Sequence, residues 1–328
     1  MSNNKEPTAC AFKTSIGGQA LIEGILMRGP DRQAIVCRKA DGSLVRKEEA
    51  LRKRPILRIP FLRGIPLFID SMVNGMRALT WSAEQLPEEE QEEPSKLDLW
   101  LERKLGSEKA EKAVIGVALV LGVLLAVGLF VLLPALLFEL LPSEMHLVLR
   151  CVLEGLIRIV IFIAYLWLVT RMPEVKRLFA YHGAEHKSIF CYEKRLELTV
   201  ENVREQSRFH PRCGTSFLVV TMLIAILLVS VMTWVLSLIP GIAALPKLAA
   251  ALVRVLAKLI ILPLIVSLTY ELNRWVGGHD TNPIARVAAW PGKMTQHLTT
   301  REPDDGMIEC AIEALKAVIP EQEGADAW

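Results

Sequence analysis

Four long apolar blocks constrain the fold of this chain more than any other feature of its sequence. They run over Ala113–Leu141, Leu147–Thr170, Ser216–Ile239 and Leu248–Leu272. Each block exceeds the roughly 20 residues that an α-helix needs to cross about 30 Å of hydrocarbon. Core helices of soluble proteins rarely stay apolar on every face over such a length. The blocks therefore predict a mainly α, polytopic protein with four transmembrane helices and a small α+β cytoplasmic region.

The charges between these blocks predict an orientation. Residues 171–215, between the second and third blocks, are rich in Lys and Arg, whereas the other two connections hold almost none. The positive-inside rule then places this loop and both termini in the cytoplasm, in a multi-pass protein of the plasma (inner) membrane. Lys and Arg total 38 against 36 Asp and Glu, so the net charge of +2 argues against nucleic acid as a partner. The six cysteines form no CxxC pair, and a disulfide framework is not expected on the reducing side.

We divide the chain into three regions on this basis: a cytoplasmic N-terminal region (1–94), a membrane domain (95–272) that includes the His-rich loop 171–215, and a cytoplasmic tail (273–328). The tail is predicted to contain an amphipathic helix that begins at Asp304 or Asp305. The N-terminal region is predicted to contain three strands and a tight turn at Asp41-Gly42, the strands being Gln19–Met27, Gln33–Lys39 and Leu44–Arg46.

A basic stretch, residues 46–63, precedes a predicted amphipathic helix over Leu67–Ala83. Basic residues interleaved with apolar ones suit the anionic headgroups of membrane lipids, where each cation contributes about 1 kcal/mol. A solvated face of a small domain is an equally good interpretation of the same pattern.

The loop between the second and third blocks contains the motif His182-Gly-Ala-Glu185-His186. On a helix the two imidazoles lie one turn apart and point the same way, so they can hold one divalent metal, Zn²⁺ being the best candidate. Glu185 lies beside them and can take a proton from a water that the ion activates. H-x-x-E-H is the inverted form of a zinc-peptidase signature. The alternative is that hydrogen bonds at the membrane interface satisfy both histidines.

A second ligand pair, His210-Pro-Arg-Cys213, lies just before the third block. Four ligands from His182, His186, His210 and Cys213 would close a tetrahedron around a structural ion. Three ligands would leave a position for water and create a hydrolytic centre. Glu271, at the inner end of the fourth block, is a rival third ligand.

Charged residues also interrupt the apolar blocks. They lie one turn apart, and we expect them to face one another, water or lipid phosphate, since an isolated charge in hydrocarbon costs several kcal/mol. A substrate or headgroup pocket and a structural ion network are both open interpretations of this set, which comprises Arg150, Glu154, Arg158, Arg254 and Lys258.

Several long motifs together resemble the YqhQ-like bacterial membrane proteins. The matching blocks run in order along almost the whole chain, over 17–30, 182–193, 198–204, 210–217 and 298–305. That family is described as predicted metal-dependent enzymes of unknown function. The resemblance implies a metal site at His182, Glu185, His186, His210 and Cys213, with no departure from the family pattern at these positions. The first and last blocks either shape a substrate cleft or pair through Glu23, Arg28 and Arg301 to join the terminal regions.

These observations lead to two main hypotheses. In the first, the protein is a zinc-dependent hydrolase at the cytoplasmic face, acting on a peptide or lipid-linked substrate with Glu185 as general base. In the second, it is a non-enzymatic membrane scaffold or assembly factor with a structural metal site. A transporter that uses the intramembrane charges is a third hypothesis, and four spans per chain would then require a homo-oligomer.

Overall fold

The computed structural model describes residues 12–51, 59–87, 100, 103, 107–139, 147–243, 245–279 and 281–328. The chain forms two compact units, which are described separately. The first unit comprises Met1–Leu86 and Val169–Trp328, and the second comprises Pro87–Leu168.

The first unit contains a four-stranded antiparallel sheet in the order β1-β2-β3-β4. Its strands are β1 (Gly17–Leu21), β2 (Gly24–Arg28), β3 (Arg32–Arg38) and β4 (Leu44–Ala50). The third and fourth strands and the turn at Gly42, where φ is +83°, confirm the prediction for that hairpin.

The prediction of a single strand over Gln19–Met27 is wrong. The segment is a hairpin whose turn contains Glu23, a non-glycine residue in the left-handed region with φ of 49°. Only Glu23 and Gly24 interrupt the apolar run, and this pair is not among those typical of a two-residue hairpin turn. The turn is instead held by tertiary contacts, because the Glu23 carboxylate accepts hydrogen bonds from Arg177 and from the Tyr181 hydroxyl.

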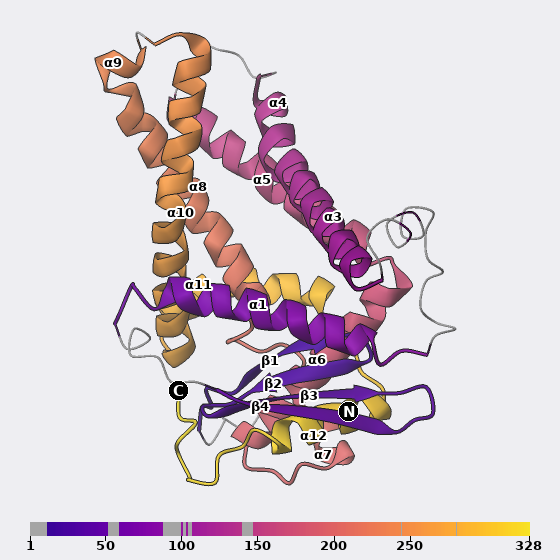
Figure 1. Cartoon of the computed structure of the whole chain (residues 1–328). Helices are drawn as coiled ribbons and strands as arrows, with labels where there is room; N and C mark the ends of the chain where they lie inside the picture. The colour runs from indigo at the N-terminus through magenta and orange to yellow at the C-terminus, as the bar shows by residue number, and fades with distance from the viewer. Residues whose placement is uncertain are drawn as a thin grey trace. The chain divides into compact units, whose positions relative to one another are not determined.

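Helices cover both faces of this sheet (Figure 1). Alternate strand residues point to opposite faces. Ile25 and Met27 therefore pack against α6 (Pro173–Glu193) and α12 (Asp305–Lys316), and Leu26 packs towards α1 (Gly64–Ala83). A short helix, α7 (Val200–Arg204), joins the α6 side of the core. The middle segment 171–215 is thus largely helical, and α6 is part of the core.

The remainder of the first unit is a helical hairpin with a crossing helix. It consists of α8 (Gly214–Ser237), α9 (Pro240–Ala243), α10 (Lys247–Gly278) and α11 (Pro283–Thr299). Helices α8 and α10 pack along each other, and α11 packs across α8 (Figure 1). The segments Leu218–Leu236 and Val255–Gly278 are long and apolar enough to cross a membrane. The first segment lies within the third apolar block, and the second overlaps the fourth block but is shifted six to seven residues towards the C-terminus.

The second unit contains the first apolar block and most of the second. Its described elements are α3 (Ser107–Val127), the π-helical turn η2 (Gly128–Leu132), α4 (Leu133–Glu139) and α5 (Leu147–Val169). The first block yields only a shorter apolar helix over Gly116–Phe130.

The predicted count of four spans is therefore not confirmed. Two helices of the described chain qualify, or three if Gly155–Val169 and Pro173–Glu193 form one span bent by 99°. The second member of that pair is α6, which is buried against the sheet and α12. The predicted intramembrane ion cluster cannot be placed, because the side chains of Arg150, Glu154, Arg254 and Lys258 lie outside the described residues.

Candidate metal centre

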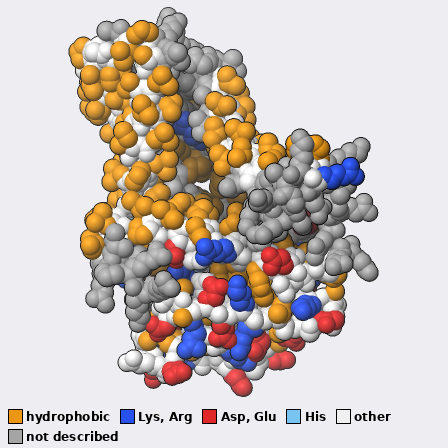
Figure 2. Space-filling view, viewed as in Figure 1, with side chains coloured by type: hydrophobic (Ala, Val, Ile, Leu, Met, Phe, Trp, Pro, Cys, Tyr) orange, Lys and Arg blue, Asp and Glu red, His pale blue; other side chains and the backbone are white. Residues whose placement is uncertain are grey.

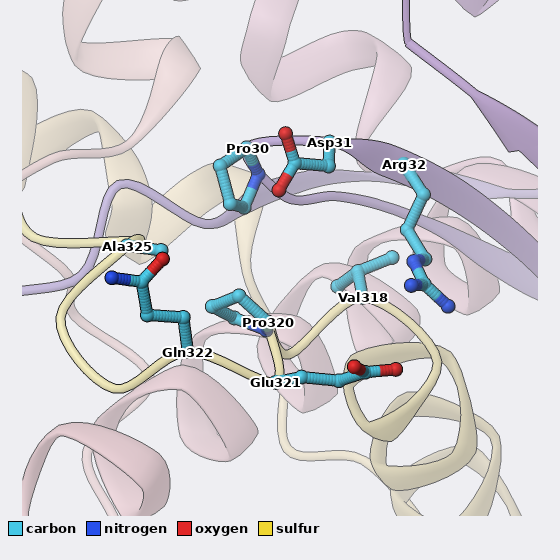
Figure 3. Close-up of a pocket in the computed structure, with 8 residues that line it drawn as sticks. All are labelled: Pro30, Asp31, Arg32, Val318, Pro320, Glu321, Gln322 and Ala325. Atoms are coloured by element: carbon cyan, nitrogen blue, oxygen red, sulfur yellow. The ribbon is translucent and has the colours of Figure 1, made fainter.

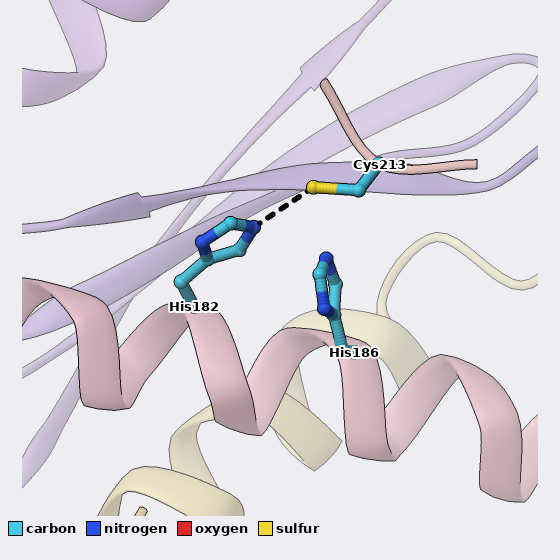
Figure 4. Close-up of side chains that lie close together, drawn as sticks. All are labelled: His182, His186 and Cys213. Atoms are coloured by element: carbon cyan, nitrogen blue, oxygen red, sulfur yellow. Dashed lines mark hydrogen bonds between the residues drawn. The ribbon is translucent and has the colours of Figure 1, made fainter. Parts of the chain in front are cut away.

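Helix α6 presents two imidazoles on one buried face. His182 and His186 are one turn apart, and their ring centroids lie 4.3 Å from each other (Figure 4). The helix is fixed on both sides, by the sheet and by α12, so the two rings have little freedom to separate.

Cys213 brings a third candidate ligand from another part of the chain. It is the N-cap residue of α8, and its Sγ lies 3.1 Å from Nε2 of His182. The backbone N–H of Thr215 donates to the same sulfur at 3.4 Å. The ligand atoms of His182, His186 and Cys213 all lie within 4.8 Å of one another, close enough to share one ion after small side-chain adjustments.

The other nitrogen of each imidazole is held by a backbone carbonyl. Nδ1–H of His182 donates to the carbonyl of Thr299 at 2.7 Å, and Nδ1–H of His186 donates to the carbonyl of Arg208 at 2.5 Å. A carbonyl only accepts, so each Nδ1 must carry the hydrogen. The buried Nε2 of His186 has no hydrogen-bond partner among the described residues. Metal-binding histidines typically show this arrangement, in which one nitrogen donates to an acceptor and the other faces the ion.

The cluster also shifts the protonation of its own members. Burial raises the pKa of the Cys213 thiol, but the imidazoles of His186 and His182 outweigh burial and hold that pKa well below its usual range. Burial lowers the pKa of His182, yet the sulfur beside it raises that pKa to about 9. Both shifts favour the charged forms of the pair, with the proton on His182. The thiolate is the form of cysteine that binds metals.

Glu185 is buried beside the three candidate ligands, with 5% of its surface exposed. Burial raises the pKa of its carboxyl, and the imidazoles of His182 and His186 offset part of that rise. Strand β1 can approach the carboxyl because residue 18 is glycine. A Cβ atom there would lie 3.1 Å from Cδ of Glu185 and 2.5 Å from the carbonyl oxygen of Leu26.

The structure does not bring His210 and Glu271 into this group. The Nε2 atom of His210 lies 3.6 Å from a carboxylate oxygen of Glu193, and its backbone amide donates to Gln296. Glu271 accepts two hydrogen bonds from Arg63, at 2.7 and 2.5 Å. Both residues were predicted as candidate ligands. The ring of His210 lies 5.6 Å from that of His186, but its contacts with Glu193 and Gln296 keep it outside the group of three, and Arg63 binds Glu271.

The tail segment after α11 contacts the candidate site in a way that the sequence motifs did not predict. It lies against α6, where the N–H of Arg301 donates to the carbonyl of Phe179 and the carbonyl of Thr299 accepts from His182. This close approach requires Gly183, because a Cβ atom there would lie 2.0 Å from the carbonyl oxygen of Arg301. The glycine inside the H-x-x-E-H motif is the sequence signal that could have indicated this contact.

We expect Gly183→Ala to destabilise the protein by about 1–3 kcal/mol, the usual cost of overpacking a core. The backbone of Arg301 must move, and the hydrogen bond from His182 to Thr299 then lengthens. Elsewhere in a helix the same change stabilises by up to about 1 kcal/mol. Gly116→Ala in α3, where a Cβ would meet nothing within 4 Å, is the matched control. Chemical unfolding of both variants in detergent measures whether each change raises or lowers the unfolding free energy. A Gly183→Ala variant as stable as the control would contradict the close contact between Gly183 and the backbone of Arg301.

The predicted pairing between the terminal blocks is not found among the described contacts. Glu23 pairs with Arg177, Arg28 pairs with Asp70 at 2.5 Å, and Arg301 donates to the carbonyl of Thr170, so these three do not pair with one another. The described residues line two surface hollows that bear on a predicted cleft. One, of about 210 Å³, lies between the β2–β3 turn and the segment after α12 (Figure 3), and the other, of about 290 Å³, lies beside α1. Neither hollow is lined by the candidate ligands.

His210 makes stability depend on pH. Burial lowers its pKa to about 4, against the opposing effect of Glu193, whereas an unfolded histidine titrates near 6.5. Between these values the unfolded chain binds more protons, so stability rises with pH, and about 3 kcal/mol is lost as the pH falls from 6.5 to 4. His210→Gln should flatten that part of the profile of unfolding free energy against pH. If unfolding free energy depended on pH equally in the parent and in His210→Gln, a neutral buried His210 would be excluded.

The fold and the cluster define a mainly helical protein with a small four-stranded antiparallel sheet, a helical hairpin of membrane-spanning length and a buried His₂Cys group at the base of that hairpin. A family model described as "Protein of unknown function (DUF1385)" matches residues 59–321, and the chain belongs to this family. It is also 32% identical to "Uncharacterized protein YqhQ" of Bacillus subtilis (strain 168), over 97% of this chain and 95% of that protein. The expected resemblance to YqhQ-like proteins is thus confirmed. No solved structure matches the chain.

Proposed function

We propose that this protein is a zinc-dependent hydrolase that acts at the cytoplasmic surface of the membrane. His182, His186 and Cys213 hold the ion, and Glu185 is the general base. The observation that carries the proposal is the orientation of the two histidines. Both donate Nδ1–H to backbone carbonyls, so that their Nε2 atoms face the sulfur of Cys213.

The donor set favours zinc over harder cations. One thiolate and two imidazoles suit Zn²⁺, whereas Mg²⁺ and Ca²⁺ prefer oxygen ligands. Three protein ligands leave the fourth tetrahedral position available, which is the pattern of catalytic rather than structural zinc. Zinc in such a site acts as a Lewis acid and lowers the pKa of water towards 7.

Glu185 has the environment that a general base needs. Its burial raises the pKa of the carboxyl above the usual value, and a raised pKa is the direction that suits a general base near neutral pH. The imidazoles of His182 and His186 offset part of the effect of burial on that carboxyl. The carboxyl lies outside the set of three ligands, so proton transfer is the role left for it.

The position of Cys213 favours a substrate at the membrane surface. The residue caps α8, and the span Leu218–Leu236 begins five residues later. At 1.5 Å per residue, the sulfur is within about 8 Å of the start of that span along the helix axis. A peptide near its membrane anchor and a lipid-linked headgroup are both substrates that reach this depth.

Two glutamine variants test the proposal against a structural role for the ion. Elemental analysis of detergent-purified protein should find one zinc per chain in the parent, in Glu185→Gln and in His210→Gln. In a strain that lacks the gene, Glu185→Gln should fail to restore function although the protein is folded and loaded. A Glu185→Gln variant that restores function fully would overturn the catalytic role and favour a scaffold or assembly factor. Absence of zinc from the parent protein would overturn the whole proposal.

A further inference from the structure

Helix α11 has its small residues inside and its large apolar residues outside. The buried face contains Ala285, Ala289 and Gly292, and it packs against α8. The opposite face is a stripe of large apolar side chains at helical spacing, all of them exposed: Ile284, Val287, Trp290 and Met294. Val287 alone exposes 73% of its surface.

Helix α1 shows the same inversion. Its buried residues are Gly64, Gly75, Ala78 and Ser82, and a Cβ at Gly64 would meet Ser267 and Tyr270 of α10 at 3.0 Å. Its exposed side chains include a second apolar stripe with spacings of three and four, namely Phe68, Ile69, Met72, Val73 and Met76.

An amphipathic helix of a soluble protein turns its large apolar side chains inward. Helices in lipid do the reverse, because lipid tails solvate the large residues and small residues let the backbones approach. Two helices of one unit therefore carry the pattern that is typical of contact with lipid.

The two stripes continue the apolar surface of the hairpin. Helix α11 contacts α8 and α1 contacts α10, and the hairpin itself exposes large residues such as Leu227 and Ile260. Figure 2 shows hydrophobic side chains over the hairpin and onto the level of the crossing helices, and charged side chains gathered over the sheet. Both helices run across the hairpin rather than along it (Figure 1). This continuity favours a bilayer as the partner over a second copy of the chain.

We propose that α1 and α11 form an interfacial platform, which lies in the plane of the membrane with both stripes in the acyl layer just below the headgroups. Each helix lies against a different helix of the hairpin. Each also carries a cation that suits anionic phospholipid headgroups, Arg77 on α1 and Lys293 on α11. The platform fixes the depth of the α+β region below the bilayer, and it does not depend on whether the protein binds zinc.

Fluorescence quenching in vesicles tests the platform. The full-length protein, with Cys10→Ser and Cys151→Ser, is labelled with bimane at Val287→Cys or Met72→Cys and reconstituted in phosphatidylcholine and phosphatidylglycerol. Ala40→Cys, at the exposed tip of the β3–β4 hairpin, is the control. We expect phosphatidylcholine brominated near the top of its acyl chains to quench positions 287 and 72 about twofold or more, consistent with burial of 5–10 Å. Aqueous iodide should quench position 40 alone.

Either of two results overturns the proposal. Quenching of positions 287 and 72 by iodide would show that the stripes face water. Protection from both quenchers would show that protein, not lipid, covers them. Circular dichroism of each labelled variant confirms that the fold is retained before quenching is compared.

Discussion

Replacing Cys213 with serine should lower the affinity for zinc at least about 100-fold. Zinc bound by a set of cysteine and histidine ligands contributes about 10–16 kcal/mol, so one ligand of the set accounts for about 3 kcal/mol. Each 1.4 kcal/mol is a factor of ten in the dissociation constant. A serine hydroxyl does not ionise near neutral pH and cannot replace the thiolate that the two imidazoles stabilise in the parent.

Competition with a zinc-binding dye on detergent-purified protein measures this change. Cys191→Ser is the matched control, because Cys191 is also buried but lies on α6 with its thiol directed to the carbonyl of Glu197. The control should bind zinc as the parent does. If Cys213→Ser also kept the parent affinity, the ion would not be held by the His₂Cys group.

Replacing Glu193 with glutamine should cost about 3–5 kcal/mol of folding free energy, which is the usual effect of leaving one buried charge without its partner. The Glu193 carboxylate is fully buried and accepts hydrogen bonds from Arg212 and from the backbone amide of Thr14 at 2.9 Å. The Arg212 side chain is only 3% exposed, so water cannot compensate for the lost charge. The loop that carries Cys213 should then lose its fixed position as well.

Chemical unfolding in detergent, followed by circular dichroism, measures this loss. The exposed pair Arg195–Glu323 provides the control, since its side chains are 63% and 83% exposed and such pairs contribute little. Glu323→Gln should change the unfolding free energy by less than about 0.5 kcal/mol. A Glu193→Gln variant within 1 kcal/mol of the parent would contradict a buried charge network at this position.

The part of the site that lies on one helix could be predicted from the sequence. The i, i+4 spacing of His182 and His186 depends only on helix geometry, and α6 is a helix there. Cys213 was predicted from a short turn motif. His210 belongs to the same motif, and its position depends on Glu193, which is seventeen residues earlier in the sequence. No local spacing carries that information.

Hydropathy alone predicted the two hairpin helices of membrane-spanning length. It did not predict how the other two apolar blocks fold. Leu218–Leu236 and Val255–Gly278 satisfy length and composition together. The first block is interrupted by the π-helical turn Gly128–Leu132, and the α5 block leads into α6 through a sharp bend. The π-helical turn and the bend depend on how the helices pack, and the composition of a segment carries no information about its packing. The same limit explains the missed turn at Glu23.

The position of Cys213 as the cap of α8 links the ion to the mechanics of the hairpin. Each residue of an α-helix turns the chain by about 100°. A rotation of α8 by even one residue would swing the thiol away from the imidazoles on α6. Under the proposed function, a bound ion would therefore fix the rotational position of α8 relative to α6, and loss of the ion would remove that constraint. The availability of zinc would then affect the orientation of the apolar segment Leu218–Leu236.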